Sequence, residues 1–290
     1  MIRKPVFGLT LGGGGVRGFA HIGVLKVLQS EGIQIDCLSG TSMGGIIAAL
    51  YACGLEVEGI EDTAKRVSKL SEMAKLFDTH FTKLDHIFSS KNIQEFFLEA
   101  VGEKKQFSDL NIPLALCAVD FHRAEEVVLQ EGDLIAAINA TMGLPGIVEG
   151  VKIDGRTLAD GGLLNNVPAD YVRSMGADVV LAVDVSPQVV NMDYWKNQKM
   201  PGIATGYWRA NAIMGSAITA AKLRHAKADF VLHPEVGEDV ATLGGFNQVA
   251  EVIEAGAKAA WDIMPDLHKE LKERFFFKKA EIEPARPIQL

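Results

Sequence analysis

The 290-residue sequence predicts an α/β fold of three α/β/α layers, with a mainly parallel central sheet flanked by helices. Two features near the start of the chain predict it. The glycine-rich loop 12–18 and the segment 40–44 each follow a short apolar run and precede residues with helical periodicity. Two successive strand–loop–helix units of this kind are typical of parallel sheets covered by helices.

The first four elements follow directly from these two units. Residues 6–11 are expected as a buried strand, and the apolar spacing over 22–28 predicts a helix after the glycine loop. Residues 33–38 are expected as the second strand. The next helix is expected to begin behind Ser42 and to end near Gly54.

Residues 57–107 are more polar and have a helical pattern. Apolar side chains recur there at helical spacing, at Val67, Leu70, Met73 and Leu76 and again at Phe96, Phe97 and Val101. Two interpretations stay open, a cap over the site and ordinary amphipathic helices packed on the sheet, because both require this spacing.

The middle of the chain returns to the sheet. Strands are expected at 113–119 and 125–129, followed by a helix at 134–140 and a turn at 143–146. A hairpin is expected over 151–158, because Asp-Gly at its centre is a strong turn signal.

The last part is mainly helical. A helix through Tyr171 precedes a buried strand at 179–185, and helices at 213–223 and 249–261 flank a strand at 230–233. With no internal repeat or low-complexity linker, one domain is expected over 1–290. Its motif-bearing core spans about 6–184, and its helical C-terminal part spans about 200–275.

Composition limits the classes of partner and compartment. A formal charge of −8 argues against nucleic acid as the main partner, although transient contact with a membrane surface stays open. The three cysteines, Cys37, Cys53 and Cys117, lie in apolar stretches without metal-like spacing, and no secretory signal is recognisable at the N-terminus. A cytoplasmic location is therefore expected, and the oligomeric state is left open.

The two glycine-rich segments point to acyl-transfer chemistry. Gly40, Thr41, Ser42, Met43 and Gly44 match G-x-S-x-G, a sharp strand-to-helix turn that presents a serine hydroxyl. The earlier loop offers backbone N–H groups suited to an oxyanion hole. The residues of that loop are Gly13, Gly14, Gly15, Val16, Arg17 and Gly18.

A serine nucleophile needs a base. Seven histidines are available: His21, His80, His86, His122, His225, His233 and His268. Asp160 is a different candidate, because Gly161 and Gly162 follow it and permit a turn that exposes its carboxylate. Asp120 and Asp184, at other predicted strand ends, are rival carboxylates or simple loop-capping groups.

Four blocks of sequence resemble the patatin-like phospholipase family. They are LGGGGVRGFAHIGVLKVL at 11–28, GTSMGG at 40–45, ATMGLPG at 140–146 and DGGLLNNVP at 160–168. Their order and spacing agree with that family over about residues 6–184.

The resemblance implies a set of roles. Ser42 would be the nucleophile, Asp160 its only base and the glycine loop the oxyanion hole, with no histidine, metal or organic cofactor required. The substrate would be a lipid or other carboxylic ester, in a groove near Pro145, Gly161 and Gly162. A Ser–Asp dyad requires a desolvated aspartate, because an unperturbed carboxylate is a weak base.

This sequence departs from the family pattern at two positions. Thr141 stands where the family often has serine, and Glu149 where it often has proline. Both flank the expected groove near Pro145, so they bear on substrate preference rather than on catalysis.

Three alternatives remain at this point. Gly13, Gly15 and Gly18 also satisfy the dinucleotide fingerprint G-x-G-x-x-G, with Asp36 as its acidic residue near the end of the second strand. A histidine-based α/β-hydrolase is the second alternative. The third is a catalytically silent regulatory or lipid-binding module.

Arg17 and the scattered aromatic side chains each permit two roles. Arg17 would either hold its loop by bonding carbonyl groups or meet a substrate phosphate. Buried or oligomeric packing and a lipid-facing surface are the alternatives for the aromatic and methionine side chains. The side chains are Met192, Tyr194, Trp195, Met200, Tyr207, Trp208, Met214 and the run Phe275, Phe276 and Phe277.

Overall fold

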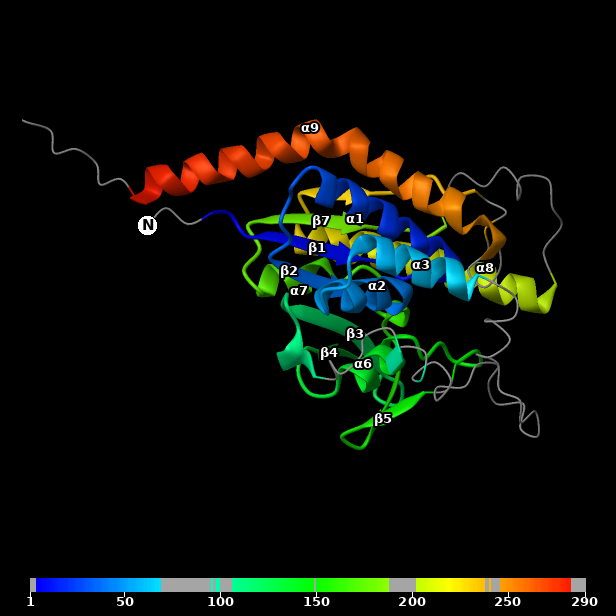
Figure 1. The fold of residues 1–290 in the computed structure, drawn as a ribbon. Helices are drawn as coiled ribbons and strands as arrows, with labels where there is room; N and C mark the ends of the chain where they lie inside the picture. Colours follow the sequence, from blue (N-terminus) through cyan, green and yellow to red (C-terminus); the bar gives the residue numbers. More distant parts are fainter. Residues whose placement is uncertain are drawn as a thin grey trace, which may run out of the picture.

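The computed structural model contains one eight-stranded, mostly parallel mixed sheet with helices on both faces (Figure 1), as predicted. It describes residues 4–68, 95, 98–99, 106–148, 150–187, 202–237, 240 and 246–282. The strands are β1 (Phe7–Leu11), β2 (Cys37–Gly40), β3 (Leu114–Asp120), β4 (Glu125–Leu129), β5 (Val151–Ile153), β6 (Arg156–Asp160), β7 (Val179–Val183) and β8 (Phe230–Leu232). The α-helices of the described residues are α1 (Ala20–Ser30), α2 (Ser42–Ala52), α3 (Val57–Val67), α6 (Leu134–Thr141), α7 (Ala169–Ser174), α8 (Ile203–Ala226) and α9 (Val249–Ile282).

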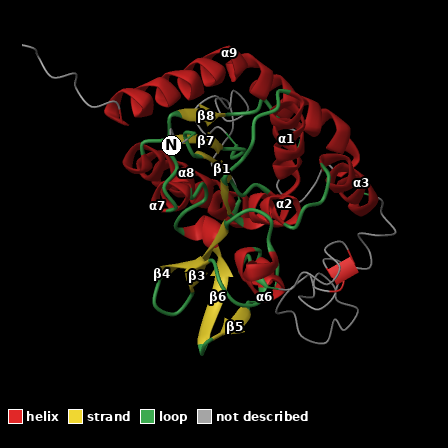
Figure 2. Cartoon of the chain, turned by 60° about the vertical axis from the view of Figure 1, so that its left-hand side comes forward, coloured by secondary structure: helices red, strands yellow, loops and turns green. Residues whose placement is uncertain are grey.

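The strand order is β5-β6-β3-β2-β1-β7-β8, with β4 paired to β3. Strands β3, β2, β1, β7 and β8 are mutually parallel, whereas β4 and β6 run antiparallel to β3. The hairpin of β5 and β6 has the predicted turn, because Asp154 and Gly155 both have positive φ, 49° and 75°. Figure 2 shows this antiparallel part at one end of the sheet.

Strands β2 and β6 occupy the same edge of β3. Strand β4 covers the other edge over Leu116–Asp120, so the pairings of Gly40 with Leu116 and of Asp160 with Ala118 both fall on the opposite edge. The two strands run in opposite directions and end two residues apart. The chain segments that follow β2 and β6 therefore emerge at the same place.

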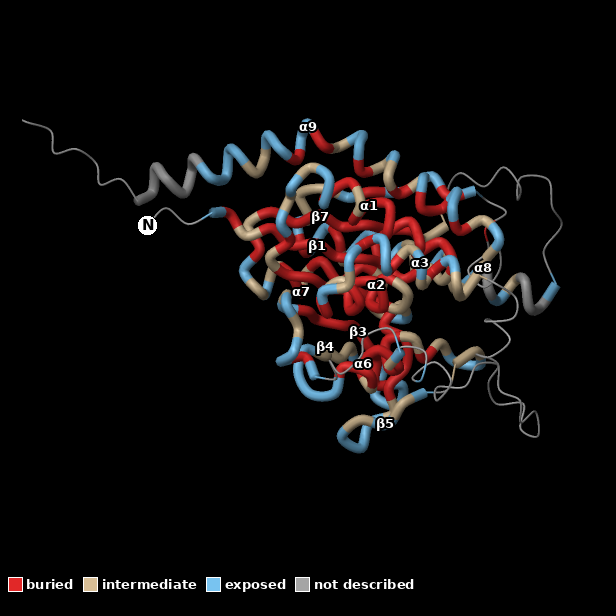
Figure 3. The backbone as a smooth tube through the Cα atoms, in the orientation of Figure 1, coloured by how far each residue is buried: buried red, intermediate tan, exposed pale blue. Residues whose placement is uncertain are grey.

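The sheet separates two apolar cores, and residues of β7 alternate between them. Val179, Leu181 and Val183 pack in the larger core, with α1, α2 and α9. Val180 and Ala182 face the smaller core, under α7 and α8. In Figure 3 the buried backbone is concentrated in the central strands and in α1 and α2.

Helix α9 lies directly across α1 (Figure 1). A Cβ on Gly256 would overlap the Ala20 carbonyl oxygen, and one on Gly23 would overlap that of Ile253, so the two backbones touch. The prediction of a helix ending at residue 261 was too short. Buried apolar side chains continue the stripe beyond it, at Met264 and Leu267.

Two other predicted boundaries differ from the structure by four residues or more. Strand β2 begins at Cys37 rather than at residue 33, because its parallel partner β1 begins only at Phe7 and pairs Gly8 with Cys37. Helix α8 begins ten residues before the predicted 213. No helix in the described part of the chain is long and apolar enough to cross a bilayer.

The predicted helical excursion over 57–107 is only partly described. Helix α3 contains Val67. The other six apolar positions of that pattern lie outside the described residues. They are Leu70, Met73, Leu76, Phe96, Phe97 and Val101.

Candidate active site

Ser42 lies at a sharp turn between β2 and α2. Its φ of 52° is left-handed, a conformation that non-glycine residues rarely adopt and that is typical of a nucleophile elbow. Gly44 makes this turn possible, because a Cβ there would overlap the carbonyl oxygens of Leu11 and Gly12. The elbow is therefore packed against the end of β1 and the start of the glycine loop.

Thr141 anchors the backbone of the elbow. Its Oγ1 accepts a hydrogen bond from the Ser42 N–H at 3.0 Å and donates one to the Cys117 carbonyl oxygen at 2.6 Å. Thr141 is fully buried. The serine that the family often has at this position would carry the same hydroxyl, so this departure from the pattern preserves the contact.

Asp160 is the last residue of β6 and is 5% exposed. Its Oδ1 accepts a hydrogen bond from the Gly162 N–H at 2.7 Å. Burial raises the pKa of Asp160 to about 6, and the Gly162 N–H and the Ser42 side chain oppose that rise. A Ser–Asp dyad requires a desolvated aspartate near the serine, and this carboxyl group is buried and interacts with the Ser42 side chain.

The glycine loop has two kinds of N–H group. The Gly12 N–H donates to Val183 at 2.9 Å and the Gly13 N–H to Asn166 at 3.1 Å, so both are occupied. Gly14 and Gly15 are half-buried, and within the described residues neither N–H donates to a backbone acceptor. These two N–H groups are therefore the candidate donors to an oxyanion.

The other residues of the predicted loop pack against or hydrogen-bond to neighbouring segments of the fold. Val16, Arg17 and Gly18 are buried, and a Cβ on Gly18 would overlap the side chain of Met43. The guanidinium of Arg17 donates to four backbone carbonyls, which fits the first of its two predicted roles. The acceptors are Val185, Val236, Gly237 and Val240.

His21 contacts the backbone of the glycine loop at Gly12. It is completely buried, and burial lowers its pKa to about 4, so the ring is neutral at pH 7. Its Nε2 lies 2.7 Å from the Gly12 carbonyl oxygen and must therefore carry the proton. His21 acts here as a donor to the backbone.

None of the described histidines hydrogen-bonds to Ser42 or Asp160. Four of them are exposed: His122, His225, His233 and His268. His80 and His86 lie outside the described residues.

The rival carboxylates bind their own loops. Asp120 accepts the N–H groups of His122 and Arg123 and pairs with the Arg123 guanidinium at 2.9 Å. Asp184 accepts the Ser186 N–H at 2.9 Å. Both carboxylates thus cap their own loops, which was the simpler of the two roles expected for them.

Asp36 contradicts the dinucleotide interpretation. It precedes β2 instead of lying near the carboxyl end of that strand, and its carboxylate accepts the Phe7 N–H at 2.7 Å. The acidic residue of a dinucleotide fold must reach a ribose beside the glycine loop, which lies at the other end of the strands.

The predicted groove residues are placed as follows. Gly161 packs against Cys117, where a Cβ would overlap the carbonyl oxygen, and Gly162 lies beside Asp160. Pro145 is exposed in the turn after α6. Glu149 lies outside the described residues.

Asn165 and Asn166 follow the Asp-Gly-Gly turn, and no role was expected for either residue. The Asn165 carbonyl accepts the Thr41 hydroxyl at 2.9 Å, and Asn166 is bonded to Gly13. Both residues belong to the DGGLLNNVP block, so the resemblance of that block to the family was the sequence feature that could have identified them as site residues. Periodicity alone does not show which loop they contact.

Part of the aromatic stretch lies on α8. Tyr207 and Met214 are 67% and 55% exposed, and Phe275 on α9 is 37% exposed. These three side chains are thus not in a buried core. Met192, Tyr194, Trp195 and Met200 lie outside the described residues, as do the side chains of Trp208, Phe276 and Phe277.

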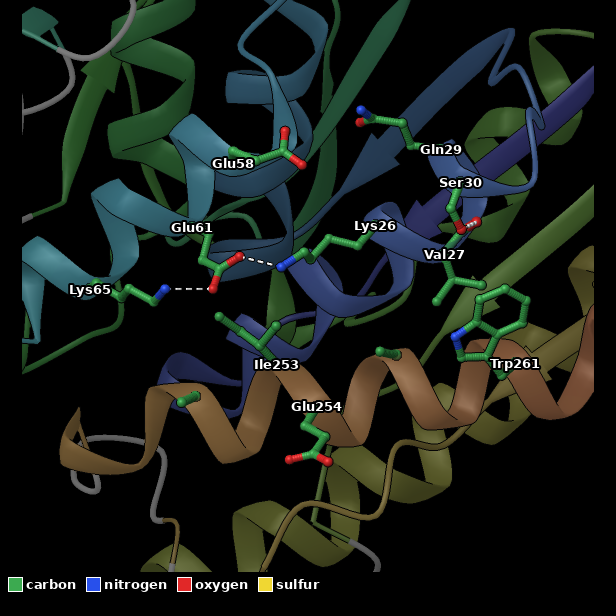
Figure 4. Close-up of a pocket in the computed structure, with 12 residues that line it drawn as sticks. Lys26, Val27, Gln29, Ser30, Glu58, Glu61, Lys65, Ile253, Glu254 and Trp261 are labelled. Carbon is green, nitrogen blue, oxygen red and sulfur yellow. Dashed lines mark hydrogen bonds and ion pairs between the residues drawn. The ribbon is translucent and has the colours of Figure 1, made fainter.

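A surface pocket of ≈ 650 Å³ lies between α1, α3 and α9 (Figure 4). Glu61 pairs with both Lys26 and Lys65 on its wall, and Trp261 forms one end. None of its lining residues belongs to the predicted site. Within the described residues, no group of three or more His, Cys, Asp or Glu is placed to hold a metal ion.

A serine on a strained elbow, a buried carboxyl group beside it and a glycine loop with free N–H groups are the attributes of an acyl-transfer site on an α/β fold. The family model described as patatin-like phospholipase matches residues 9–173. The chain belongs to that family.

Curated relatives share this segment. The chain is 36% identical over 184 residues to patatin-like phospholipase domain-containing protein 6 of Mus musculus, covering 62% of the chain and 13% of the relative. It is 32% identical over 183 residues to an uncharacterized NTE family protein of Mycobacterium bovis, covering 63% of the chain and 50% of the relative. The chain thus matches half or less of the length of these relatives.

Solved structures share the fold. VipD from Legionella pneumophila superposes with a TM-score of 0.57 at 14% identity, over 93% of this chain and 67% of that one. Human GIVD cytosolic phospholipase A2, crystallised with methyl γ-linolenyl fluorophosphonate, gives 0.55 at 11% identity, over 95% and 60%.

Proposed function

We propose that the protein is a serine acyl hydrolase that cleaves carboxylic ester bonds of lipids through a Ser42–Asp160 dyad. The observation that carries the proposal is the Asp160 carboxyl group, 5% exposed and hydrogen-bonded to the Ser42 side chain. Burial raises its pKa, and the bond to Ser42 opposes that rise. A carboxylate with a pKa of about 6 is a better proton acceptor than an ordinary one, because its basicity is closer to that required at neutral pH.

The reaction would have two halves. Ser42 Oγ attacks the ester carbonyl carbon while Asp160 takes its proton, and the N–H groups of Gly14 and Gly15 bind the oxyanion. Collapse of this intermediate expels the alcohol, which receives the proton from Asp160, and leaves an acyl group on Ser42. Asp160 then takes a proton from water, whose oxygen attacks the acyl carbon. Collapse of this second intermediate breaks the bond to Ser42 Oγ, releases the acid and returns the proton from Asp160 to Ser42. The N-terminus of α2 further stabilises negative charge on the serine oxygen.

The substrate class follows from family membership together with this site. Phospholipids, lysophospholipids and neutral lipid esters all present the same reacting bond, and we place the substrate among them. Action on such substrates implies transient contact with a membrane surface, and a cytoplasmic location stays part of the proposal.

The first experiment is covalent labelling of the purified protein. A fluorophosphonate should phosphonylate Ser42, located by peptide mass, and p-nitrophenyl esters of short and long chains should be hydrolysed. The same class of reagent is bound in the crystal of the human phospholipase A2. Folded protein that shows neither signal would indicate a silent regulatory or lipid-binding module instead.

A further inference from the structure

Asn166 joins the glycine loop to the loop that carries Asp160. Its backbone carbonyl accepts the Gly13 N–H at 3.1 Å, and its side-chain Nδ2 donates to the Gly13 carbonyl oxygen at 3.0 Å. Nδ2 also donates a second hydrogen bond, to Ser186 Oγ at 3.0 Å. One residue thus holds both polar backbone groups of Gly13.

The Asn166 side chain also fills the space between the two loops. A Cβ added to Gly13 would lie 2.6 Å from Asn166 Oδ1, and one added to Gly162 would lie 2.9 Å from it. Gly13 also adjoins the nucleophile, since the same Cβ would lie 3.1 Å from Ser42 Cβ. Asn166 therefore contacts the loops that flank the serine.

Peptide geometry gives these bonds a consequence. In a planar trans peptide the carbonyl of one residue and the N–H of the next point in opposite directions. The bond from Asn166 to the Gly13 carbonyl therefore fixes the direction of the Gly14 N–H. On the other side of Gly13, His21 holds the Gly12 carbonyl, so the preceding peptide is fixed too.

We propose that Asn166 is a positioning residue for ester hydrolysis, which orients the Gly14 N–H for the oxyanion through the bond from its side-chain Nδ2 to the Gly13 carbonyl oxygen. The inference rests on the proposed function. Without this bond the Gly13–Gly14 peptide would be free to rotate, because glycine restricts its own backbone little. An oxyanion donor acts in the transition state, so its misorientation lowers kcat and leaves KM nearly unchanged.

The test compares Asn166→Ala and Asn166→Asp with Ser186→Ala in the full chain. The aspartate variant keeps the size of the side chain and loses the donor to Gly13. The serine variant removes only the other acceptor of Asn166 Nδ2. Each protein is titrated with the fluorophosphonate, so that p-nitrophenyl ester kinetics refer to active sites rather than to total protein.

A long-chain alkyl trifluoromethyl ketone supplies the second measurement. Ser42 Oγ adds to its carbonyl carbon, the proton passes to Asp160, and the resulting hemiketal oxygen occupies the oxyanion position. We expect kcat per site to fall by about 10²-fold in both Asn166 variants, with the ketone inhibition constant rising by a similar factor. Ser186→Ala should stay close to wild type in both.

Two results would overturn the inference alone: an active wild type whose Asn166 variants keep kcat per site, or variants that lose only substrate affinity. A smaller fraction of titratable sites with unchanged constants would show a purely structural role and would also overturn it. A wild type that neither hydrolyses ester nor binds the ketone would overturn the proposed hydrolase, and the inference with it.

Discussion

Gly40 and Asp160, the last residues of β2 and β6, pair with Leu116 and Ala118 on one edge of β3. The two strands approach this point from opposite directions, so only Cys117 separates their ends along β3. The nucleophile elbow continues from one end and the Asp-Gly-Gly turn from the other. This irregularity in the sheet thus brings together Ser42 and Asp160, which lie 118 positions apart in the sequence.

This arrangement accounts for the burial of Asp160. A strand end inside a sheet is covered on both faces, and the carboxyl group there is shielded from water by the neighbouring loops. The β6 ladder and the Gly162 N–H hold it in place. The energetic cost of burying this carboxylate leads to the first prediction.

Asp160→Asn should lower kcat and raise stability at neutral pH. Loss of a general base is expected to lower kcat by about 10²–10⁴-fold. The folded-state pKa of about 6 lies above the ordinary aspartate pKa of 3.8, so folding near pH 7 buries a charge, at a cost of about 3 kcal/mol. The neutral amide avoids that cost, and urea unfolding at pH 7 should show the gain.

The sign of this effect reverses the usual behaviour of acidic residues. Because the folded-state pKa of Asp160 is raised, its protonation stabilises the folded wild type. This stabilisation is complete below the unfolded-state pKa and is lost as pH rises through about 6. The stability difference between Asp160→Asn and wild type should therefore shrink as pH falls from about 6 toward 3.8. A variant less stable than wild type at pH 7 would contradict the assigned burial cost.

Much of the fold was predictable because its signals are local. The glycine loop, the G-x-S-x-G turn and the hairpin at Asp154-Gly155 each depend on a few adjacent residues whose backbone conformations are restricted. The order of the strands was not predictable in the same way. Nothing near Asp160 in the sequence shows that β6 shares an edge of β3 with β2.

The residues of the candidate site could be proposed from the sequence, but the connections between them could not. Ser42 and Asp160 came from motifs and from the family resemblance. The bonds of Asn166 to Gly13 and of Thr141 to Ser42 join residues 153 and 99 positions apart, so no periodicity could reveal them. The end of α9 was missed for another reason, since a helix interior that contains Pro265 contradicts local propensity.

The pH dependence of kcat/KM should follow the ionisation of Asp160. We expect kcat/KM to rise with pH through an apparent pKa of about 6, because Asp160 must be ionised to accept the serine proton. A histidine base would give a similar midpoint, so the profile is measured at two temperatures. The pKa of a carboxyl group changes little on warming, whereas that of imidazole falls. A marked fall would favour a histidine base.

Thr141 should be replaceable by serine but not by valine. Thr141→Val removes the hydroxyl that joins the Ser42 N–H to the Cys117 carbonyl, and each group left without a partner costs about 1–3 kcal/mol. We expect a lower thermal midpoint and a lower kcat, since the elbow loses its anchor. Thr141→Ser keeps both bonds and loses one methyl group. Equal behaviour of the two variants would show that the hydroxyl is dispensable.

Two helical glycines provide a matched test of the elbow. In Gly44→Ala the new Cβ overlaps the carbonyl oxygens of Leu11 and Gly12, so α2 must shift and Ser42 with it. We expect destabilisation of about 1–3 kcal/mol or more, with loss of fluorophosphonate labelling. Gly59 lies exposed in α3 with no atom near its Cβ position, so Gly59→Ala should stabilise the helix by about 0.5–1 kcal/mol and leave labelling unchanged. If Gly44→Ala were labelled at the wild-type rate, the close packing of the elbow on β1 would not be what holds Ser42 in position.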